Sequence, residues 1–171
     1  MKVTIDGKEY ECKRVVMDND NVEIILEEDS KKETGYERVD KNDRYYFTIN
    51  DVDIITTIDW HGTIDNVYYD NANYYSSEEI AKNNTRADKL MRQLRRFSVE
   101  NRETDINWTD NKECGYRIVY NCQRSIIEIA CTFTRKNFGT IYFDSEKLAR
   151  RAIKEFEDEL IWYFTEYKDS L

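Results

Sequence analysis

A short phrase of sequence occurs twice in this chain of 171 residues. N-Y-Y-S-S-E-E-I-A at residues 73–81 matches T-I-Y-F-D-S-E-K-L-A at residues 140–149 with a constant offset of 68 residues. Tyr75 corresponds to Phe143, Ser77 to Ser145 and Ile80 to Leu148. Apolar residues at helical spacing follow both copies, so each copy marks the start of a helix. The sequence therefore predicts one structural unit that is built twice.

Strand-like segments open each predicted unit. Runs of aromatic and β-branched residues with alternating polarity are typical of half-buried strands. They occur at residues 45–50, 53–58 and 68–69 in the first unit, and at residues 116–121, 126–133 and 140–143 in the second. Each unit is therefore expected to run strand, strand, short strand and helix, with Tyr68-Tyr69 as the short strand of the first unit.

One helix is expected to follow each set of strands. The hydroxyl of Ser76 can cap the first helix while Glu79 returns the contact, which is the capping-box pattern. Helical spacing of apolar residues then continues from Ile80 to about residue 100. The second helix is expected to start after Asp144 and to continue to about Tyr167.

The first 28 residues read as two β-hairpins, the first of them turning at Asp6-Gly7, a strong signal for a tight turn. The charged segment 27–44 reads as a linker or exposed loop. We therefore predict an α+β fold of antiparallel sheets with one helix packed on each. The predicted divisions are an N-terminal hairpin region with linker (1–42), a first repeat (43–104) and a second repeat (105–171).

Residue types suited to catalysis are sparse. The five glycines form no phosphate-binding motif, and His61 is the only imidazole, so no acyl-transfer triad is expected. The four cysteines form no C-x-x-C pair, and the D-x-D pair Asp51 and Asp53 reads as a solvated turn, so neither a metal nor another cofactor is expected. His61 is expected in a turn after a strand. We expect a protein that is not an enzyme.

Charge is distributed unevenly along the chain, whose net charge is −9. Residues 43–79 carry eight acidic residues and one basic residue, whereas residues 80–104 carry seven basic and three acidic residues. The acidic, tyrosine-rich segment could occupy a basic groove that normally holds DNA or RNA, in the manner of a DNA mimic. The basic segment reads either as a solvated helix face or as a surface that binds phosphates or carboxylates.

The order Y-Y-F (45–47), Trp60, Ile64-Asp65, N-Y-Y-S-S-E-E-I-A and R-R-F (95–97) resembles a group of small phage and prophage proteins. The resemblance covers roughly residues 45–165, and it departs from the group pattern at Ala72-Asn73, where the group has Gly-Asn. In size and charge the chain is also similar to phage inhibitors of host defence, including anti-CRISPR proteins. The resemblance brings no catalytic residues. Because Met1-Lys2 leads directly into an alternating V-T-I run and shows no signal peptide, the protein is expected in the cytoplasm of the bacterial host cell.

The leading hypothesis is a phage-encoded, non-enzymatic inhibitor that binds a nucleic-acid-handling host defence protein, with a CRISPR effector nuclease and its guide RNA as the expected partner. Direct nucleic-acid binding is the alternative, and an oligomeric accessory protein with Trp162 at its interface is a third hypothesis. No apolar run approaches 18 residues, so no membrane contact is expected. The expected partner-binding residues are Asp65, Tyr68, Tyr69, Asp70, Tyr74, Glu78 and Glu79. The alternative phosphate-binding residues are Lys89, Arg92, Arg95 and Arg96.

Overall fold

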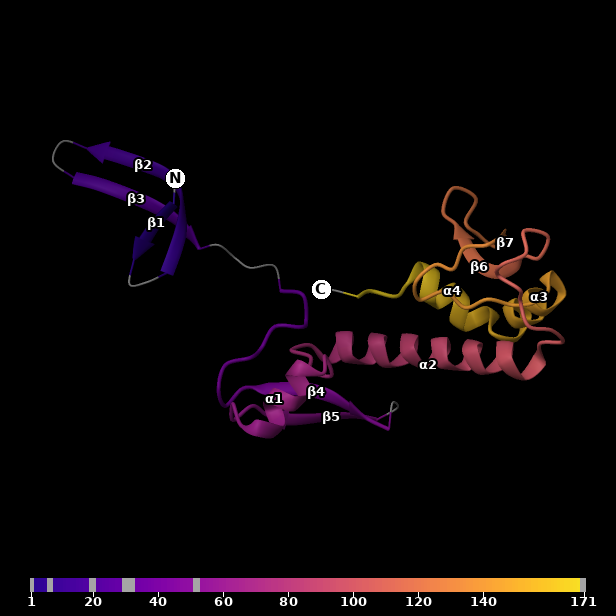
Figure 1. The fold of residues 1–171 in the computed structure, drawn as a ribbon. Helices are drawn as coiled ribbons and strands as arrows, with labels where there is room; N and C mark the ends of the chain where they lie inside the picture. The colour runs from indigo at the N-terminus through magenta and orange to yellow at the C-terminus, as the bar shows by residue number, and fades with distance from the viewer. Residues whose placement is uncertain (1, 6–7, 19–20, 29–32, 51–52, 170–171) are drawn as a thin grey trace.

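The computed structural model describes residues 2–5, 8–18, 21–28, 33–50 and 53–169 (Figure 1). Within these residues the chain forms seven strands and four helices. All strand pairs are antiparallel, and the strands make one three-stranded and two two-stranded sheets. This mixture of helices and antiparallel sheets confirms the predicted α+β class.

The N-terminal sheet contains β1 (Lys2–Ile5), β2 (Lys8–Asp18) and β3 (Asn21–Glu28), paired in that order. The strands match the two predicted hairpins, and the pairing of β2 with β3 shifts between Cys12 and Arg14. The predicted turn residues Asp6 and Gly7 lie outside the described residues. Figure 1 draws this indigo sheet away from the remaining elements.

The two repeats share their strands and differ in their helices. The first unit contains β4 (Arg44–Ile49), β5 (Asp53–Ile58), α1 (Thr63–Asp70) and the start of α2 (Glu78–Asn101). The second unit contains β6 (Gly115–Asn121), β7 (Ile126–Thr132), α3 (Glu146–Glu155) and α4 (Glu157–Thr165). Figure 1 shows α2 running from β4, β5 and α1 at one end to the second unit at the other.

Equivalent residues of the repeat make equivalent contacts. Tyr75 exchanges both backbone hydrogen bonds with Tyr46, and Phe143 does so with Tyr116, at 2.8–3.0 Å. The chain then enters a helix capped by a serine in both units: Ser77 accepts from the N–H of Ile80, and Ser145 from that of Leu148. The repeated phrase is thus a bridge residue followed by a helix N-cap.

Four details of the prediction are corrected. Tyr68 and Tyr69 lie in helix α1 and not in a strand. The third strand of each unit is reduced to the single bridge at Tyr75 or Phe143. The α2 cap is Ser77, one residue after the predicted Ser76, so Glu79 lies in the first turn as part of the helix.

The fourth correction concerns the second helix. The predicted single helix is divided into α3 and α4 at Phe156, whose φ and ψ of −113° and 24° are not helical. The Phe156 ring meets the edge of Phe97 at 5.7 Å between ring centroids. Each unit therefore has two helices after its strands, α1 and α2 in the first and α3 and α4 in the second, where one was predicted.

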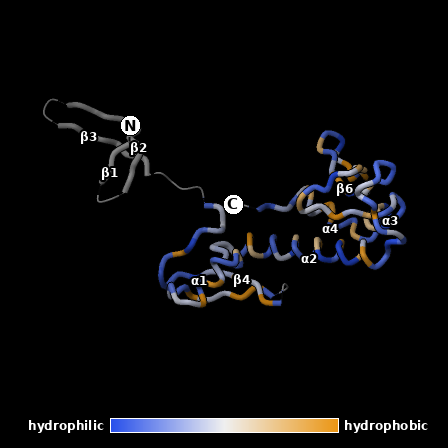
Figure 2. Tube along the Cα trace, in the orientation of Figure 1, coloured by the Kyte–Doolittle hydropathy of each residue, from blue (hydrophilic) through white to orange (hydrophobic). Residues whose placement is uncertain are grey.

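Helix α2 contributes to the buried clusters of both units. Ile80 and Ala81 pack with Tyr75 in the first unit. Leu90 and Leu94, farther along the helix, pack in the second unit's core. That core consists of Leu90, Leu94, Phe97, Phe143, Leu148, Ala149, Ala152 and Leu160. Figure 2 shows α2 as a mostly hydrophilic helix with apolar residues recurring along it, as expected for a helix with one buried stripe.

Candidate partner-binding surface

A buried carboxylate holds the loop between β5 and α1. Asp59 is 0% exposed and accepts hydrogen bonds from the Tyr74 hydroxyl at 2.8 Å, the Arg38 Nε at 3.1 Å and the His61 N–H at 2.6 Å. A buried charge is tolerated when it is paired and hydrogen-bonded in this way. Arg38 also donates to Asn66 on α1 at 2.7 Å, so the network ties the segment before β4 to the helix.

Asp65 organises the start of α1. Its Oδ2 accepts the backbone N–H groups of Trp60 at 3.0 Å and Gly62 at 2.9 Å, and its Oδ1 accepts the Tyr45 hydroxyl at 2.9 Å. A carboxylate in the first turn also interacts favourably with the helix dipole. Asp65 is 7% exposed, so its predicted place in a partner-binding surface is corrected: its oxygen atoms are used inside the first unit.

The ionisation of this network follows from burial and hydrogen bonding. Burial alone would raise the pKa of Asp59, but hydrogen bonds from Arg38, His61 and Tyr74 outweigh it and hold the pKa at about 2. Burial, followed by the hydrogen bond to Asp59, raises the pKa of Tyr74, and burial together with Asp65 raises that of Tyr45. The Asp59 carboxylate, with its lowered pKa, is therefore charged, and the Tyr45 and Tyr74 phenols, with their raised pKa values, are neutral at pH 7.

Aromatic rings fill the space between the strands and α1. Tyr45 and Tyr74 stack with 4.1 Å between ring centroids, and Tyr68 lies 4.1 Å from Phe47. Tyr74 is 2% exposed and Tyr68 is half-buried. The prediction that Tyr74 contacts a partner is therefore corrected, because its ring and hydroxyl are both held within the first unit.

The outer side of α1 is apolar and exposed. Ile64 and Val67 lie three residues apart and so share a helix face, and they are 70% and 51% exposed. The loop before α1 presents Trp60, which is 61% exposed and lines the same groove as Ile64. We call Trp60, Ile64 and Val67 the α1 patch. Large apolar residues gathered on a surface mark interaction sites, whereas single ones do not.

A groove of about 530 Å³ opens between β5 and α1, next to the α1 patch. Tyr45 and Phe47 from β4 contribute to its lining, together with Thr57 from β5 and Ile64 from α1. The full lining comprises Tyr45, Phe47, Thr57, Ile58, Trp60, Gly62, Thr63, Ile64, Asp65 and Tyr68. The groove is mainly apolar and suits an apolar side chain.

The remaining predicted partner-binding residues are on the surface. Tyr69 is 41% exposed, with the Arg38 guanidinium 5.4 Å from its ring centroid. Asp70, Glu78 and Glu79 are exposed, and Glu78 pairs with Lys82 at 2.6 Å. The structure thus keeps Tyr69, Asp70, Glu78 and Glu79 available to a partner, and it adds the α1 patch.

Sequence reasoning missed the α1 patch because it assigned Tyr68 and Tyr69 to a strand. The signal for a helix was present in Gly62-x-x-Asp65, which places an acid in a first helical turn, and in the i, i+3 spacing of Ile64 and Val67. His61 does lie in a turn after β5, with a positive φ of 55° and its Nε2 3.3 Å from the Val39 carbonyl oxygen.

The alternative phosphate-binding residues lie on the C-terminal half of α2. The side chains of Lys89, Arg92, Arg95 and Arg96 are all exposed. Arg86, one turn earlier, bonds to Glu159 at 2.8 Å and covers the Trp162 ring at 4.0 Å. Trp162 is buried beneath it, which corrects the hypothesis that Trp162 forms an intermolecular interface.

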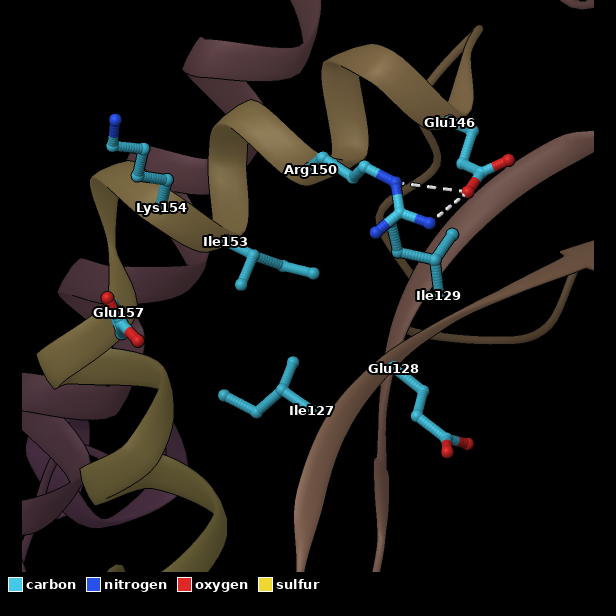
Figure 3. A pocket seen from close by; sticks show the side chains of 8 residues that line it. All are labelled: Ile127, Glu128, Ile129, Glu146, Arg150, Ile153, Lys154 and Glu157. Atoms are coloured by element: carbon cyan, nitrogen blue, oxygen red, sulfur yellow. Dashed lines mark hydrogen bonds and ion pairs between the residues drawn. The ribbon is translucent and has the colours of Figure 1, made fainter.

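A second groove of about 530 Å³ lies between β7 and the helices α3 and α4. Figure 3 shows Ile127 and Ile153 facing each other across it, with Arg150 bonded to Glu146 at one side. Its Glu128 also bonds to Arg124, at 2.8 Å. Arg150, Glu146 and Glu128 are therefore paired with charges of this chain.

The described residues hold no group of three or more His, Cys, Asp or Glu side chains that could bind a metal ion. None of the helices in the described part of the chain has the length and apolar character needed to cross a membrane. Comparisons with protein-family models, curated proteins and solved structures found no match. The resemblance to small phage proteins and the predicted domain bounds stay predictions.

Proposed function

We propose that the protein is a phage-encoded, non-enzymatic inhibitor of a nucleic-acid-handling host defence protein, with a CRISPR effector nuclease and its guide RNA as the expected partner. The observation that carries this proposal is the α1 patch within an acidic segment. Trp60, Ile64 and Val67 are exposed together, and residues 43–79 have a net charge of −7.

Such a surface suits a partner that is basic and partly apolar. CRISPR effectors hold the guide duplex in a positively charged channel and read the adjacent DNA motif with arginines. Exposed carboxylates would steer the inhibitor towards those arginines, and electrostatic steering raises association rates by about 10- to 1,000-fold. An exposed tryptophan beside them supplies the kind of anchor that dominates binding energy.

The polar groups of the first unit favour binding over chemistry. Asp59, Asp65, Tyr45 and Tyr74 are buried and bonded to one another or to backbone groups. Their positions shape the loop that presents Trp60. We therefore assign them a positioning role, and we assign contact to the α1 patch with Tyr69, Asp70, Glu78 and Glu79.

Guide-directed DNA cleavage by purified effectors tests the proposal. Excess protein should suppress cleavage by at least one effector type, and unchanged cleavage across a panel of effectors would contradict it. The triple variant Asp70→Lys, Glu78→Lys, Glu79→Lys should then lose inhibition while remaining folded, because all three side chains are exposed. Asp65 is left unchanged in this variant because its burial makes it a folding residue.

Direct nucleic-acid binding by α2 is the second candidate, favoured by four exposed basic residues within eight positions. Lys89, Arg92 and Arg96 share one helix face by their spacing. The variant Arg92→Glu, Arg95→Glu, Arg96→Glu separates the two candidates, because it should abolish phosphate binding yet spare an acidic inhibitor. A gel shift with DNA and RNA at low salt that shows no complex removes this candidate.

A further inference from the structure

The outer edge of β5 is open. β4 pairs with β5 on one side and with the bridge residue Tyr75 on the other, so β5 has no strand neighbour beyond β4 among the described residues. Edge strands are usually protected by proline, lysine or bulges. β5 reads D-I-I-T-T-I, the pairing has no register shift, and the whole chain lacks proline.

The hydrogen bonds of β4 show which groups of β5 face outward. Tyr46 exchanges its backbone hydrogen bonds with Tyr75, on the side away from β5. Successive residues of a strand direct their N–H and C=O groups to opposite sides. Tyr45 and Phe47 therefore bond to their partners Thr57 and Ile55. The alternate residues of β5 point their backbone groups to the open edge; they are Ile54, Thr56 and Ile58.

The groove beside α1 lies along the same strand. Thr57 and Ile55 are paired with Tyr45 and Phe47 and so share their face of the sheet. Thr57, Tyr45 and Phe47 all line the groove, with the α1 residues on its other side. A strand added to the open edge of β5 would place every second side chain on this face, beside the groove.

The charges near β5 indicate what kind of segment can bind at its open edge. Asp53 begins β5 itself, and Asp43 precedes β4, where its carbonyl accepts the Asp59 N–H at 2.9 Å on the side away from the open edge. Both side chains are exposed, as is Asp70 at the end of α1, and Arg44 is the one basic residue of the 43–79 segment. A second copy of this chain would bring a further net charge of −9 to the same edge.

We propose that the open edge of β5 binds an extended, basic segment of the partner protein by strand addition, with alternate apolar side chains entering the groove beside α1. Main-chain hydrogen bonds would supply affinity and the groove would supply specificity, as in other cases of strand addition. This inference rests on the proposed function for the identity of the partner, whereas the mode of binding follows from the edge and the groove.

Synthetic peptides test the mode of binding. The probes are fluorescein-labelled decapeptides that alternate Lys or Arg with Val, Ile or Phe, and the same peptides carrying N-methyl groups on alternate residues. Fluorescence anisotropy should show binding of the unmodified peptides, and the N-methylated set should bind at least about 10-fold more weakly because edge hydrogen bonds are lost. Equal binding of both sets, or binding of neither, would overturn the proposal.

Thr56→Pro blocks the edge on the protein side. It removes an N–H that faces solvent and is not used by β4, so the sheet should tolerate it. Thr56→Val is the matched control, because it keeps the N–H. The proline variant should bind the peptides at least about 10-fold more weakly, whereas the valine variant should stay within about twofold of the wild type. Equal binding of both variants would overturn the proposal.

Hydrogen exchange gives a second measurement on the unmodified chain. The amides of Ile54, Thr56 and Ile58 should exchange rapidly in the free protein and become protected when the peptide binds, while those of Ile55 and Thr57 stay slow throughout. Unchanged exchange at the three outward amides would contradict strand addition. A dimer by light scattering that Thr56→Pro dissociates would assign the edge to a second copy and overturn the partner proposed here.

The proposed function and the proposed mode of binding can be disproved separately. If the peptides bind to the edge but no nuclease is inhibited, the proposed function is wrong and the edge site stands. If a nuclease is inhibited equally by the wild type and by Thr56→Pro, the proposed function stands and strand addition is wrong.

Discussion

The two units follow one plan and stabilise it with different chemistry. The second unit packs an apolar cluster in which Phe143, Leu148 and Leu160 meet residues of α2. In the first unit Tyr45 and Tyr74 occupy the interior, and their hydroxyls bond to the buried Asp65 and Asp59. A buried polar network stabilises the fold only when every donor and acceptor in it is hydrogen-bonded. It therefore restricts the conformation of the loop more narrowly than an apolar cluster does.

The units also differ in the segment that connects the second strand to the bridge residue. The first unit has α1 there, whereas residues 133–139 of the second unit contain no helix. The helix brings with it the groove, the α1 patch and the carboxylates that anchor its loop. The difference suggests a division of roles in which the second unit supplies a stable core and the first unit supplies the binding surface.

The largest effect is expected in the apolar core. Phe143→Ala removes a ring that is almost fully buried and should cost about 3–5 kcal/mol of unfolding free energy in urea titrations. Tyr75→Ala, at the equivalent position, should cost less, about 2 kcal/mol, because among the described residues its buried cluster has two other members, Ile80 and Ala81. Equal losses would contradict the assignment of the main core to the second unit.

Asp59→Ala should be the most damaging change in the polar network. It removes the acceptor of the buried Tyr74 hydroxyl and of the Arg38 Nε, and we expect a loss of about 3 kcal/mol. Asp70→Ala is the control, since that carboxylate is exposed and should change stability by less than about 0.5 kcal/mol. Thermal or urea unfolding of the two variants measures the difference.

Acid should weaken the network in a defined pH range. The folded pKa of Asp59 is about 2, below the value near 3.9 of an unfolded aspartate, so the unfolded chain binds the proton first. Its contribution is therefore complete above about pH 4 and decreases as the pH falls towards 2. Asp59→Asn should flatten the pH dependence of the unfolding free energy in this range. An unchanged slope would show that Asp59 is not ionised as described.

The smallest effect should be shared equally by both units. Ser77 and Ser145 cap α2 and α3 with the same contact, at 3.4 and 3.2 Å. Each serine replaced by alanine should cost about 1 kcal/mol. A loss at only one of the two positions would show that the repeated phrase does not have the same role in both units.

Much of this plan could be predicted from sequence because the repeat is carried by local signals. Alternating polarity predicted the strands, and the serine before an apolar run predicted each helix start to within one residue. The bridges at Tyr75 and Phe143 occupy the repeated positions because those residues precede the helix cap in both copies. The α+β class followed from these signals alone.

The site was predicted less well because its residues acquire their roles from distant contacts. The burial of Asp65 depends on Tyr45, twenty positions away, and that of Tyr74 depends on Asp59. An acidic residue in a polar segment gives no local sign that it will be buried. Exposure of Ile64 and Val67 likewise depends on which face of α1 meets β4, and no periodicity in eight residues determines that.

We propose that the first unit makes the contact with the partner while the second unit serves as its scaffold. Inhibition of guide-directed cleavage by two matched double variants tests it most directly. Trp60→Ala with Ile64→Ala changes the α1 patch, and Phe133→Ala with Phe138→Ala changes exposed aromatic residues of the second unit. We expect the first variant to inhibit at least about 100-fold more weakly than the wild type, as for paired interface anchors, and the second to inhibit like the wild type. Retained inhibition by the first variant together with loss in the second would contradict the claim.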